Sequence, residues 1–529
     1  MHLRAKLRAA GAAGTTIIAI AISSACGSSH SSDTAQPDGD RGPSYGLDGG
    51  GTAGDAPTTP PPPSSFTVSL VPDGGTGVQR VNFAVPLALG QLTDPSTLEI
   101  LVAGAEVPAA RRVLARYADG SIRSVQLQAD IDVSAATSLD VAIGTTPGLT
   151  GITMADVTTT TTGSGNNVHP KVWAVLPTSV LLGSGLGGPL VAQADVANTP
   201  LDAWTTLCNY DRWDTDDFLT KASASRDVWL YDRVTAMYRG YFTTGALSPL
   251  RSAYREAEMY RAGMTISNGV ATAIAPPTAN DDLKYYYSQN MALHYLLTGD
   301  DRFREAAEAV SARVASMWNP VYDGGDRFWT ERHAGFTLLA HEWALAVTDD
   351  KADVIAARSE AAVSAYLDEQ KRYPAGYTDQ NARCFGHSAT AHGEDFGYDG
   401  CSPWMSAILA EPLDEYARRV GGQRGDAVRA SLAMLGRSLA RDGRDATGKP
   451  YYWMGEGTSS DEVDDYDEHW GESAYVIALA WNATGRTEPA LKTAADELVA
   501  GFKAHGDVGQ TRSFNWQCRA AVATPALLR

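Results

Sequence analysis

The stretch DDLKYYYSQNMALHYLLTGDDRFREAAEAVSARVASM, residues 281–317, decides the fold of the larger part of this chain. After its Tyr-rich start the first half is apolar. The turn Thr298-Gly299-Asp300 divides it from a second half in which apolar residues recur every three or four positions. Such a period is typical of an amphipathic helix with one face in water. The stretch therefore predicts a helical hairpin whose second helix, Arg302 to Met317, is the outer one.

The same hairpin signature returns along the chain from about residue 220. First helices such as Phe336 to Val347 carry small and apolar residues, which places them inside. Further dividing turns lie at Thr244-Gly245-Ala246, Thr348-Asp349-Asp350, Gly421-Gly422 and Thr484-Gly485-Arg486. Their spacing of roughly 50 to 70 residues is typical of stacked helical hairpins. We expect residues 220–529 to form an (α/α) toroid of about five hairpins, with a sixth from flanking segments; an open solenoid is the alternative.

Residues 65–157, which precede the helices, alternate between apolar and polar side chains, as Phe66, Val68 and Leu70 do. Period two with turn residues between the runs predicts antiparallel strands, and Asp119-Gly120 is a hairpin signal. We expect a small all-β sandwich or barrel, which we interpret as a packing or glycan-contacting domain rather than a catalytic one. The Gly- and Thr-rich residues 158–219 have only a weak pattern and predict a connector.

The bulk composition fits this multidomain organisation. A chain of 529 residues is too long for one ordinary core, and 44% hydrophobic with 20% charged residues suits a soluble globular protein. The formal net charge of −19 argues against a nucleic-acid partner, because phosphate contacts need a basic surface. An anionic ligand would need a local island of Arg, Lys, His or helix N-termini.

The first 26 residues predict an export signal. Arg4, Lys6 and Arg8 form a basic start, and an apolar stretch too short to span a bilayer follows. It ends in Ser23-Ser24-Ala25-Cys26, which resembles a bacterial lipoprotein cleavage box and makes Cys26 the lipid acceptor. Residues 27–64 are rich in Ser, Gly, Asp, Thr and Pro and predict a disordered tether. We expect a protein that is exported and either lipid-anchored in the cell envelope or secreted, with membrane contact only through this lipid.

Four cysteines remain beyond Cys26, an even number suited to an oxidising compartment. Cys384 and Cys401 are close in sequence and flank a His-rich loop, so they are the first candidate pair for a disulfide. Cys208 and Cys518 would then join the two ends of the helical domain. Neither pair has the spacing of zinc ligands, and we expect no metal there.

Groups of aromatic and ionisable residues open each first helix. If the inner helices run parallel, all the groups converge on one end of the toroid, where helix N-termini favour an anion. Trp and Tyr platforms with interleaved charges suit sugar rings, so we expect a carbohydrate site. Taken singly, each group also fits core aromatics and helix caps. The groups are Arg226 to Arg233, Asp282 to Asn290, Arg327 to His333, Glu394 to Tyr398 and Tyr466 to Trp470.

Two of these segments resemble a known family. The hairpin Tyr117-Ala118-Asp119-Gly120-Ser121-Ile122-Arg123-Ser124-Val125 resembles one in the N-terminal domain of exo-rhamnogalacturonan-lyase-like proteins, with Ser124 in place of the usual Trp. The helical part, with Trp329-Thr330-Glu331-Arg332-His333, resembles the (α/α)-toroid polysaccharide lyases. The resemblance implies an exported lyase that cleaves a uronate-containing polysaccharide by β-elimination.

In such an elimination a neutraliser hydrogen-bonds the uronate carboxylate, and a Tyr or His removes the C5 proton. Asn290, Arg332 and His333 are the candidate neutralisers, Tyr287 or Tyr398 the base or acid, and His392 a reserve base. Lys284, Arg327 and Arg383 are candidates for binding flanking carboxylates. The other substrate-binding candidates are Trp229, Tyr231, Trp329, Glu331, Trp404, His469 and Trp470.

Two other functions remain open. A glycoside hydrolase on the same scaffold needs two carboxylates, which Glu331 and Asp395 would supply, with Glu468 in place of either. A non-catalytic glycan-binding surface lipoprotein would use the same aromatic residues without an acid–base pair. We expect no cofactor; the acidic run Asp461–Glu468 predicts a solvated loop, with a calcium site as the alternative.

Overall fold

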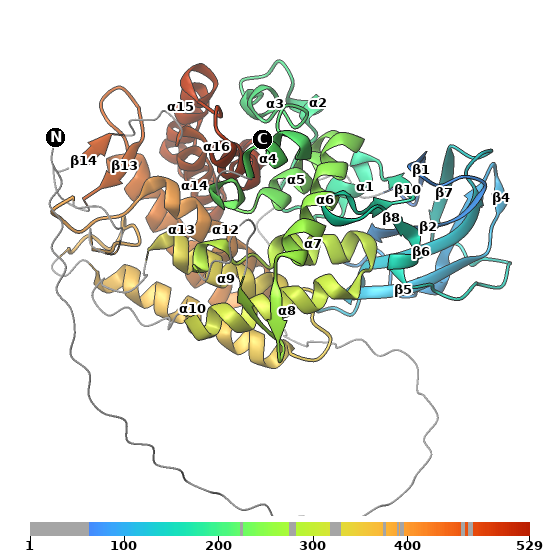
Figure 1. The fold of residues 1–529 in the computed structure, drawn as a ribbon. Helices are drawn as coiled ribbons and strands as arrows, with labels where there is room; N and C mark the ends of the chain where they lie inside the picture. Colours follow the sequence, from blue (N-terminus) through green and yellow to red (C-terminus); the bar gives the residue numbers. More distant parts are fainter. Residues whose placement is uncertain are drawn as a thin grey trace, which may run out of the picture. The chain divides into compact units, whose positions relative to one another are not determined.

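The computed structural model describes residues 63–222, 226–273, 282–317, 330–373, 377–388, 391, 396–455, 461–463 and 469–529. The predicted export signal with Cys26, and the tether up to residue 62, lie outside the described residues. Within them the chain forms two sheets first and then a long series of helices, as predicted (Figure 1).

The β domain consists of two antiparallel sheets. One has the order β10-β1-β7-β3-β4 and the other β2-β6-β5. Phe66, Val68 and Leu70 are buried on one face of β1, which confirms the alternation. Asp119-Gly120 joins β5 to β6, as the hairpin signal predicts. The strands are β1 (Ser65–Pro72), β2 (Val78–Pro86), β3 (Leu98–Val102), β4 (Ala105–Glu106), β5 (Ala109–Arg116), β6 (Ile122–Asp132), β7 (Ser138–Ile143) and β10 (Val172–Val175).

The first sheet extends beyond residue 157, where we placed the end of the β domain. β10 lies in the expected connector, yet it pairs with β1, with Leu70 opposite Ala174. A short hairpin of β8 (Thr161–Thr162) and β9 (His169–Pro170) precedes it. Short helices then lead into the helical domain: α1 (Thr178–Gly183), α2 (Gln193–Val196), α3 (Ala203–Leu207) and α4 (Thr215–Ala222).

Five helical hairpins follow, each with a buried inner helix and a half-exposed outer one. Every residue of α7 is buried, whereas the outer helix α8 buries one face. Gly245 and Gly299 end α5 and α7 in left-handed conformations that glycine adopts without strain. The inner helices are α5 (Arg233–Thr244), α7 (Gln289–Thr298), α9 (Glu331–Leu345), α12 (Pro403–Val420) and α14 (Trp470–Ala483). The outer helices are α6 (Leu247–Ala262), α8 (Asp301–Met317), α10 (Ala352–Arg372), α13 (Gly422–Asp442) and α15 (Pro489–His505).

The helices close into a ring, so the domain is a toroid and not an open solenoid. Inner helices pack in the order α5, α7, α9, α12, α14, and α16 (Thr511–Arg519) packs between α14 and α5. The Cys208–Cys518 disulfide ties α16 to the segment before α5, and Cys384–Cys401 forms the second predicted bridge. Both disulfides are compatible with an exported protein. α17 (Thr524–Leu528) packs on α14.

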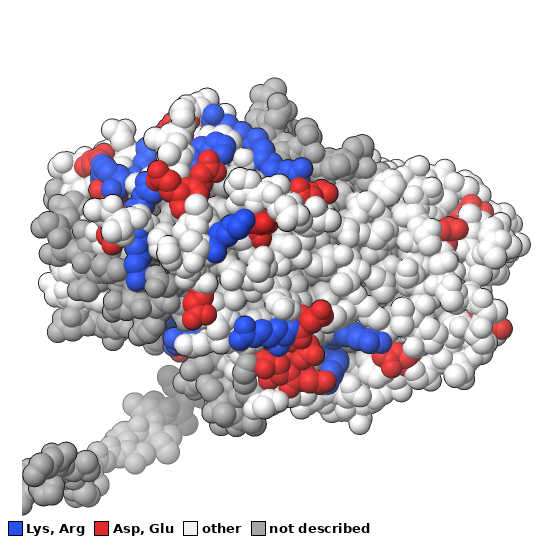
Figure 2. Space-filling model, turned by 90° about the horizontal axis from the view of Figure 1, so that it is seen from above, with Lys and Arg blue, Asp and Glu red and all other residues white. Residues whose placement is uncertain are grey.

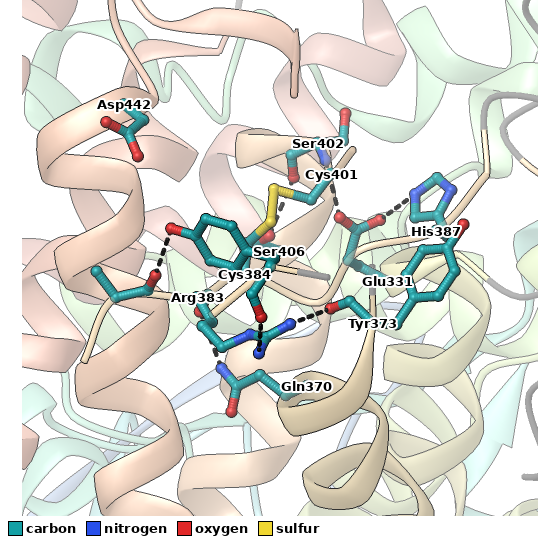
Figure 3. Close-up of a disulfide and its surroundings, with 12 residues drawn as sticks. Glu331, Gln370, Tyr373, Arg383, Cys384, His387, Cys401, Ser402, Ser406 and Asp442 are labelled. Atoms are coloured by element: carbon teal, nitrogen blue, oxygen red, sulfur yellow. Dashed lines mark hydrogen bonds and ion pairs between the residues drawn. A yellow bond between two sulfur atoms is a disulfide. The ribbon is translucent and has the colours of Figure 1, made fainter. Parts of the chain in front are cut away.

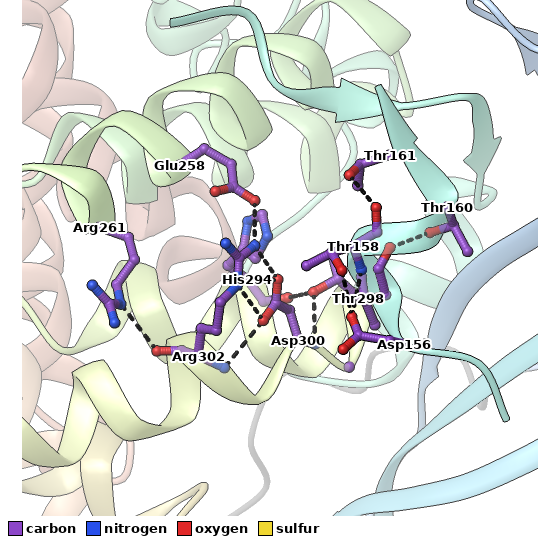
Figure 4. Close-up of polar contacts among 12 residues, drawn as sticks. Asp156, Thr158, Thr160, Thr161, Glu258, Arg261, His294, Thr298, Asp300 and Arg302 are labelled. Carbon is purple, nitrogen blue, oxygen red and sulfur yellow. Dashed lines mark hydrogen bonds and ion pairs between the residues drawn. The ribbon is translucent and has the colours of Figure 1, made fainter. Parts of the chain in front are cut away.

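The β domain contacts the helical ring at the carboxyl end of α7. Ser124 Oγ donates to the Leu296 carbonyl at 2.6 Å, and Asn82 Nδ2 donates to the Thr298 carbonyl at 2.9 Å. Close to this contact Arg302 of α8 forms ion pairs with Asp300 and with Glu258 of α6, which connects the two outer helices (Figure 4). The starting turn of α7 therefore lies at the end of the helix away from the β domain. None of the helices that the structure describes combines the length and the apolar character that crossing a membrane requires.

Candidate functional site

Side chains from the starts of four inner helices and from α16 meet at one end of the ring. The Tyr231 ring centre lies 5.8 Å from Trp404 and 5.0 Å from Trp516. Trp404 stacks on His469, with ring centres 4.7 Å and planes 9° apart. Arg332 Nη1 donates to the Tyr231 hydroxyl at 3.4 Å. Tyr231, Arg332, Trp404 and His469 belong to the starts of α5, α9, α12 and α14, whereas Trp516 is the sixth of the nine residues of α16. We call these five residues the N-terminal mouth. The meeting of the four helix starts is what inner helices of one direction produce.

The turn that presents Tyr231 is strained. Tyr231 and the following Asp232 both have positive φ angles, 69° and 57°. Each such non-glycine residue costs about 1–3 kcal/mol, and strain of this kind gathers at functional sites. Three contacts hold the turn: the Tyr231 N–H donates to the Tyr287 hydroxyl at 3.0 Å, Asn290 Nδ2 donates to Asp232 at 2.8 Å, and Asn515 Nδ2 donates at 2.8 Å to the carbonyl before Tyr231.

A cavity of about 10 Å³ lies behind the mouth, which is about the space that one buried water needs. Tyr231, Trp404 and Trp516 line it together with Glu472 and Arg519. Burial raises the pKa of the Tyr231 hydroxyl, and the positive charges of Arg332 and Arg512 partly offset this effect. The Tyr231 hydroxyl is therefore a proton-carrying group next to a guanidinium.

His469 and Arg332, together with the neighbouring residues Arg512 and Tyr452, set the charge of the mouth and of its surroundings. Burial and the nearby Arg512 lower the pKa of His469 to about 3, so its imidazole is neutral near pH 7. Arg332, Arg512 and Tyr452 are half-buried, and Tyr452 lies 5.9 Å from the Trp404 ring. A ligand that reaches the mouth from solvent thus meets two guanidinium groups and a tyrosine first. An anionic sugar fits this arrangement.

Tyr287 and Asn290 lie behind the mouth and not at its surface. Both are at most 1% exposed, and Tyr287 precedes α7, which begins at Gln289. The Tyr287 hydroxyl donates to the Lys284 carbonyl at 2.5 Å, while it accepts from Tyr231. The structure thus gives both residues the position of supports for the strained turn.

His333 is also buried, and its Nδ1 lies 2.7 Å from the Thr330 hydroxyl that caps α9. Lys284 is half-buried and pairs with Asp282 at 3.0 Å, so its charge is engaged within its own segment. His333 lies in the first turn of α9, and Lys284 lies in the short helical turn before α7.

The Cys384–Cys401 loop is fastened to the start of α9 (Figure 3). Glu331 accepts from the Ser402 N–H at 2.8 Å and lies 2.8 Å from His387 Nε2, and all three groups are buried. Arg383 donates to backbone carbonyls on both sides of residues 374–376. Tyr398 is half-buried, with its ring 6.4 Å from Trp453. Glu331 and Arg383 thus hold the loop in place.

Trp229 and Trp470 lie outside the mouth, although each is near the start of an inner helix. Trp229 packs edge-on against Phe218 at 4.7 Å. Trp470 lies 5.9 Å from His505 of the outer helix α15. Both are core residues between inner and outer helices.

Several predicted residues lie outside the described part of the chain: Arg327, Trp329, His392, Asp395 and Glu468. The side chains of Asp461 to Glu468, where we considered calcium, do so too; residues 461–463 form β14 (Asp461–Val463), which pairs with β13 (Tyr451–Met454). The roles that we expect for these residues stay predictions.

Sequence reasoning missed the contribution of α16. Trp516, Asn515 and Arg512 lie in the stretch TRSFNWQCR, residues 511–519, which combines aromatic and polar residues as the other starts do. It is followed by no dividing turn and no outer helix, so it carried no hairpin signature. Tyr452 was missed because it lies in the short strand β13.

One group of carboxylates among the described residues is close enough to hold a metal ion: Glu308, Asp349 and Asp350. Lys351 pairs with both Glu308 and Asp350, and Arg304 pairs with Asp349. Cationic side chains therefore already neutralise this group, and it gives no support for a metal.

The net negative charge is not concentrated near one patch on the face drawn in Figure 2. There basic and acidic side chains are interspersed over the helical part, and the β domain at the right has few of either. Among the described residues on this face no large patch of one sign stands out.

No family model matches the sequence, and no curated protein matches it. Three solved structures are similar in fold. A polysaccharide lyase has a TM-score of 0.42 and 11% identity, over 63% of this chain and 96% of its own. A family 105 glycoside hydrolase of C. acetobutylicum has a TM-score of 0.42 and 10% identity, over 60% and 99%. A family 88 glycosyl hydrolase from Bacteroides vulgatus has a TM-score of 0.41 and 10% identity, over 59% and 96%.

Proposed function

We propose that this protein is an exported polysaccharide lyase that cleaves a uronate-containing polysaccharide by β-elimination at the N-terminal mouth. The observation that carries the proposal is the Arg332–Tyr231 pair. A guanidinium and a phenol lie within 3.4 Å, on a strained turn and among aromatic rings that suit a sugar. The half-buried Arg512 adds a second positive charge.

In the proposed reaction Arg332 and Arg512 bind the uronate carboxylate and stabilise the negative charge that develops on it. Tyr231, as the phenolate, takes the C5 proton; the C4–O4 bond breaks, and a double bond forms between C4 and C5. The proton then passes from Tyr231 to the leaving oxygen, which restores the phenolate. Because burial raises the pKa of Tyr231, we expect the rate to rise with pH in the alkaline range.

Four other predicted residues have supporting roles in this proposal. Asn290 contacts Asp232, and Tyr287 contacts the Tyr231 N–H, so Asn290 and Tyr287 are positioning residues. His333 stays the candidate for a further hydrogen bond to the substrate at the start of α9. Tyr398, on the disulfide loop, stays the candidate for a second proton donor.

A glycoside hydrolase is the second candidate. It requires two carboxyl groups at the cleaved bond, one of them protonated. Glu331 is buried and engaged with the Ser402 N–H and His387. The pair that we propose for the hydrolase is therefore Asp395 with Glu468.

The two reactions leave different products. We expect the purified chain, mixed with alginate, polygalacturonate, glucuronan or a glycosaminoglycan, to raise the ultraviolet absorbance of at least one, because elimination forms a conjugated unsaturated uronate. Reducing ends should appear in equal number. Reducing ends without absorbance would establish the hydrolase, and binding with neither signal would establish a glycan-binding protein.

We also propose that the chain is exported and lipidated at Cys26. The basic start, the apolar stretch and the small residues before Cys26 support this proposal. Mass spectrometry of the protein from a bacterial membrane fraction should find a diacylglyceryl group on an N-terminal Cys26. A Cys26→Ala variant should be recovered without lipid. An unmodified wild-type chain that begins elsewhere would show ordinary secretion instead.

A further inference from the structure

An open cavity of about 300 Å³ lies between the β domain and the outer helix α6. The strand β9 and the turn before it pack on α6 at this place. The volume is at the lower end of the range for small-molecule sites, roughly 300–1,000 Å³, and has room for a sugar unit. We call it the junction pocket; its lining residues are Asp73, Asn167, His169, Trp173, Arg251 and Arg255.

The junction pocket is separate from the N-terminal mouth. α6 runs back from the turn at which α5 ends, so its first half lies at the carboxyl end of α5. Arg251 and Arg255 are the fifth and ninth of the sixteen residues of α6, one helical turn apart and therefore on one face of the helix. Tyr231 precedes the opposite end of α5. A ligand in the junction pocket consequently leaves the mouth free.

The two arginines are only loosely engaged. Arg251 Nη2 is 3.4 Å from Asp73, and Arg255 Nη1 is 3.3 Å from the mostly exposed Asp216. Arg255 Nε also donates to the Asn166 carbonyl at 3.4 Å. Ion pairs near the surface at these lengths contribute little, about 0–1 kcal/mol, so a better placed carboxylate can displace them. A bidentate contact of a ligand carboxylate with a guanidinium is shorter and stronger.

The floor of the pocket is ordered and polar. Trp173, which is 2% exposed, donates from Nε1 to Asp73 at 2.9 Å and fixes that carboxylate. The His169 ring is nearly parallel to Trp173, with centres 6.2 Å apart, and Arg251 lies over the Trp173 ring at 5.9 Å. Asp73, His169 and Asn167 thus offer acceptors and donors for hydroxyl groups beside two cationic groups.

We propose that the junction pocket binds an acidic sugar residue without cleaving it. Arg251 and Arg255 would bind the carboxylate, and Asp73, Asn167 and His169 the ring hydroxyls. Such a site would retain a polyanionic chain on a protein whose net charge of −19 repels it. The binding does not depend on the elimination at the mouth, because a free monosaccharide has no glycosidic bond to cleave.

The test is isothermal titration calorimetry of the full mature chain carrying Arg332→Met, which removes the main carboxylate ligand of the mouth. Sodium glucuronate should bind at one site. The further changes Arg251→Gln and Arg255→Gln together should weaken this binding at least tenfold. Arg372→Gln, at a more exposed arginine of α10 outside the pocket, should leave it unchanged. Thermal melting of each variant shows whether it is folded.

Two further titrations identify the ligand chemistry. Glucose, which lacks the carboxylate, should bind at least tenfold more weakly than glucuronate, and so should inorganic phosphate, which lacks the ring. Phosphate binding as tight as that of glucuronate would overturn the proposal in favour of a plain anion site. Unchanged glucuronate binding in the folded double-arginine variant would overturn it as well. Elimination by the wild-type chain is measured separately, so either proposal can fail alone.

Discussion

Tyr231→Phe should lower the rate of uronate elimination by about 10²- to 10⁴-fold while the protein keeps its melting temperature, because positioned acid–base groups contribute about that much. The variant loses only the hydroxyl, which accepts one hydrogen bond, from Arg332. The ring and its packing against Trp404 and Trp516 stay. Steady-state kinetics by ultraviolet absorbance measures the loss.

Two further variants separate proton transfer from support. Tyr241→Phe is the matched control, since Tyr241 is buried in α5, the helix that follows Tyr231, with its hydroxyl hydrogen-bonded to Leu176, away from the mouth. It should keep wild-type activity. Tyr287→Phe removes the hydroxyl that accepts from the Tyr231 N–H and donates to the Lys284 carbonyl, and it should lower activity less than Tyr231→Phe does.

The pH profile shows whether Arg332 acts on Tyr231. The charge of Arg332 opposes the rise in the pKa of Tyr231 that burial causes. Arg332→Met should therefore shift the alkaline limb of the profile to higher pH, in addition to weakening substrate binding.

If Tyr231→Phe keeps activity within twofold of wild type, Tyr231 does not transfer the proton.

Glu411→Ala should lower the free energy of unfolding by about 3–5 kcal/mol, the range measured when one partner of a buried ion pair is removed. Glu411 lies in α12 inside the ring and pairs with Arg239 of α5 at 2.5 Å and Arg519 of α16 at 2.7 Å. Gln289 of α7 also donates to it. Without the carboxylate, two buried guanidinium groups lose their counter-charge. Chemical denaturation measures the change.

An exposed pair supplies the control. Asp368→Ala breaks the pair of Asp368 with Arg372, whose side chains are 60% and 67% exposed, and should cost less than about 1 kcal/mol. If Glu411→Ala lowers the free energy of unfolding by no more than Asp368→Ala does, the ion pairs of Glu411 with Arg239 and Arg519 do not stabilise the ring.

The effect of Glu411 should also depend on pH. Burial alone would raise its pKa, but Arg239 and Arg519 outweigh burial and lower it below the ordinary value of 4.5. A carboxyl group with a lowered pKa in the folded state stabilises the fold fully above its unfolded pKa, and the contribution is lost as the pH falls through the folded pKa. The difference between wild type and Glu411→Ala should thus shrink below about pH 4.5.

The hairpins and the disulfides could be predicted because local patterns encode them. The alternation of apolar and polar residues in β1 and the turn at Gly299 each depend on residues that are neighbours in the sequence. The four cysteines beyond Cys26 leave only three ways to form two disulfides. β10 escaped prediction, since a four-residue strand among Gly-rich turns has too few positions to show a period.

The sequence indicates that the site lies at the starts of the inner helices, but not which side chains point into it. Trp229 and Tyr231 are two residues apart, yet one packs outward and the other lines the cavity at the centre. The positive φ of Tyr231 and Asp232 reverses the chain there, and no pattern of residue types indicates it. The sequence therefore predicts Tyr287 or Tyr398 as the proton-transfer group, with His392 in reserve, whereas the Tyr231 hydroxyl is the one that lies beside Arg332.

The most direct test is a crystal structure of Tyr231→Phe soaked with a uronate trisaccharide, which the slow variant should leave intact. The account predicts density at the N-terminal mouth, with a carboxylate on Arg332 and a sugar ring against Trp404 or Tyr452. A trisaccharide bound elsewhere on the helical ring, with the mouth still closed by its own side chains, would contradict it.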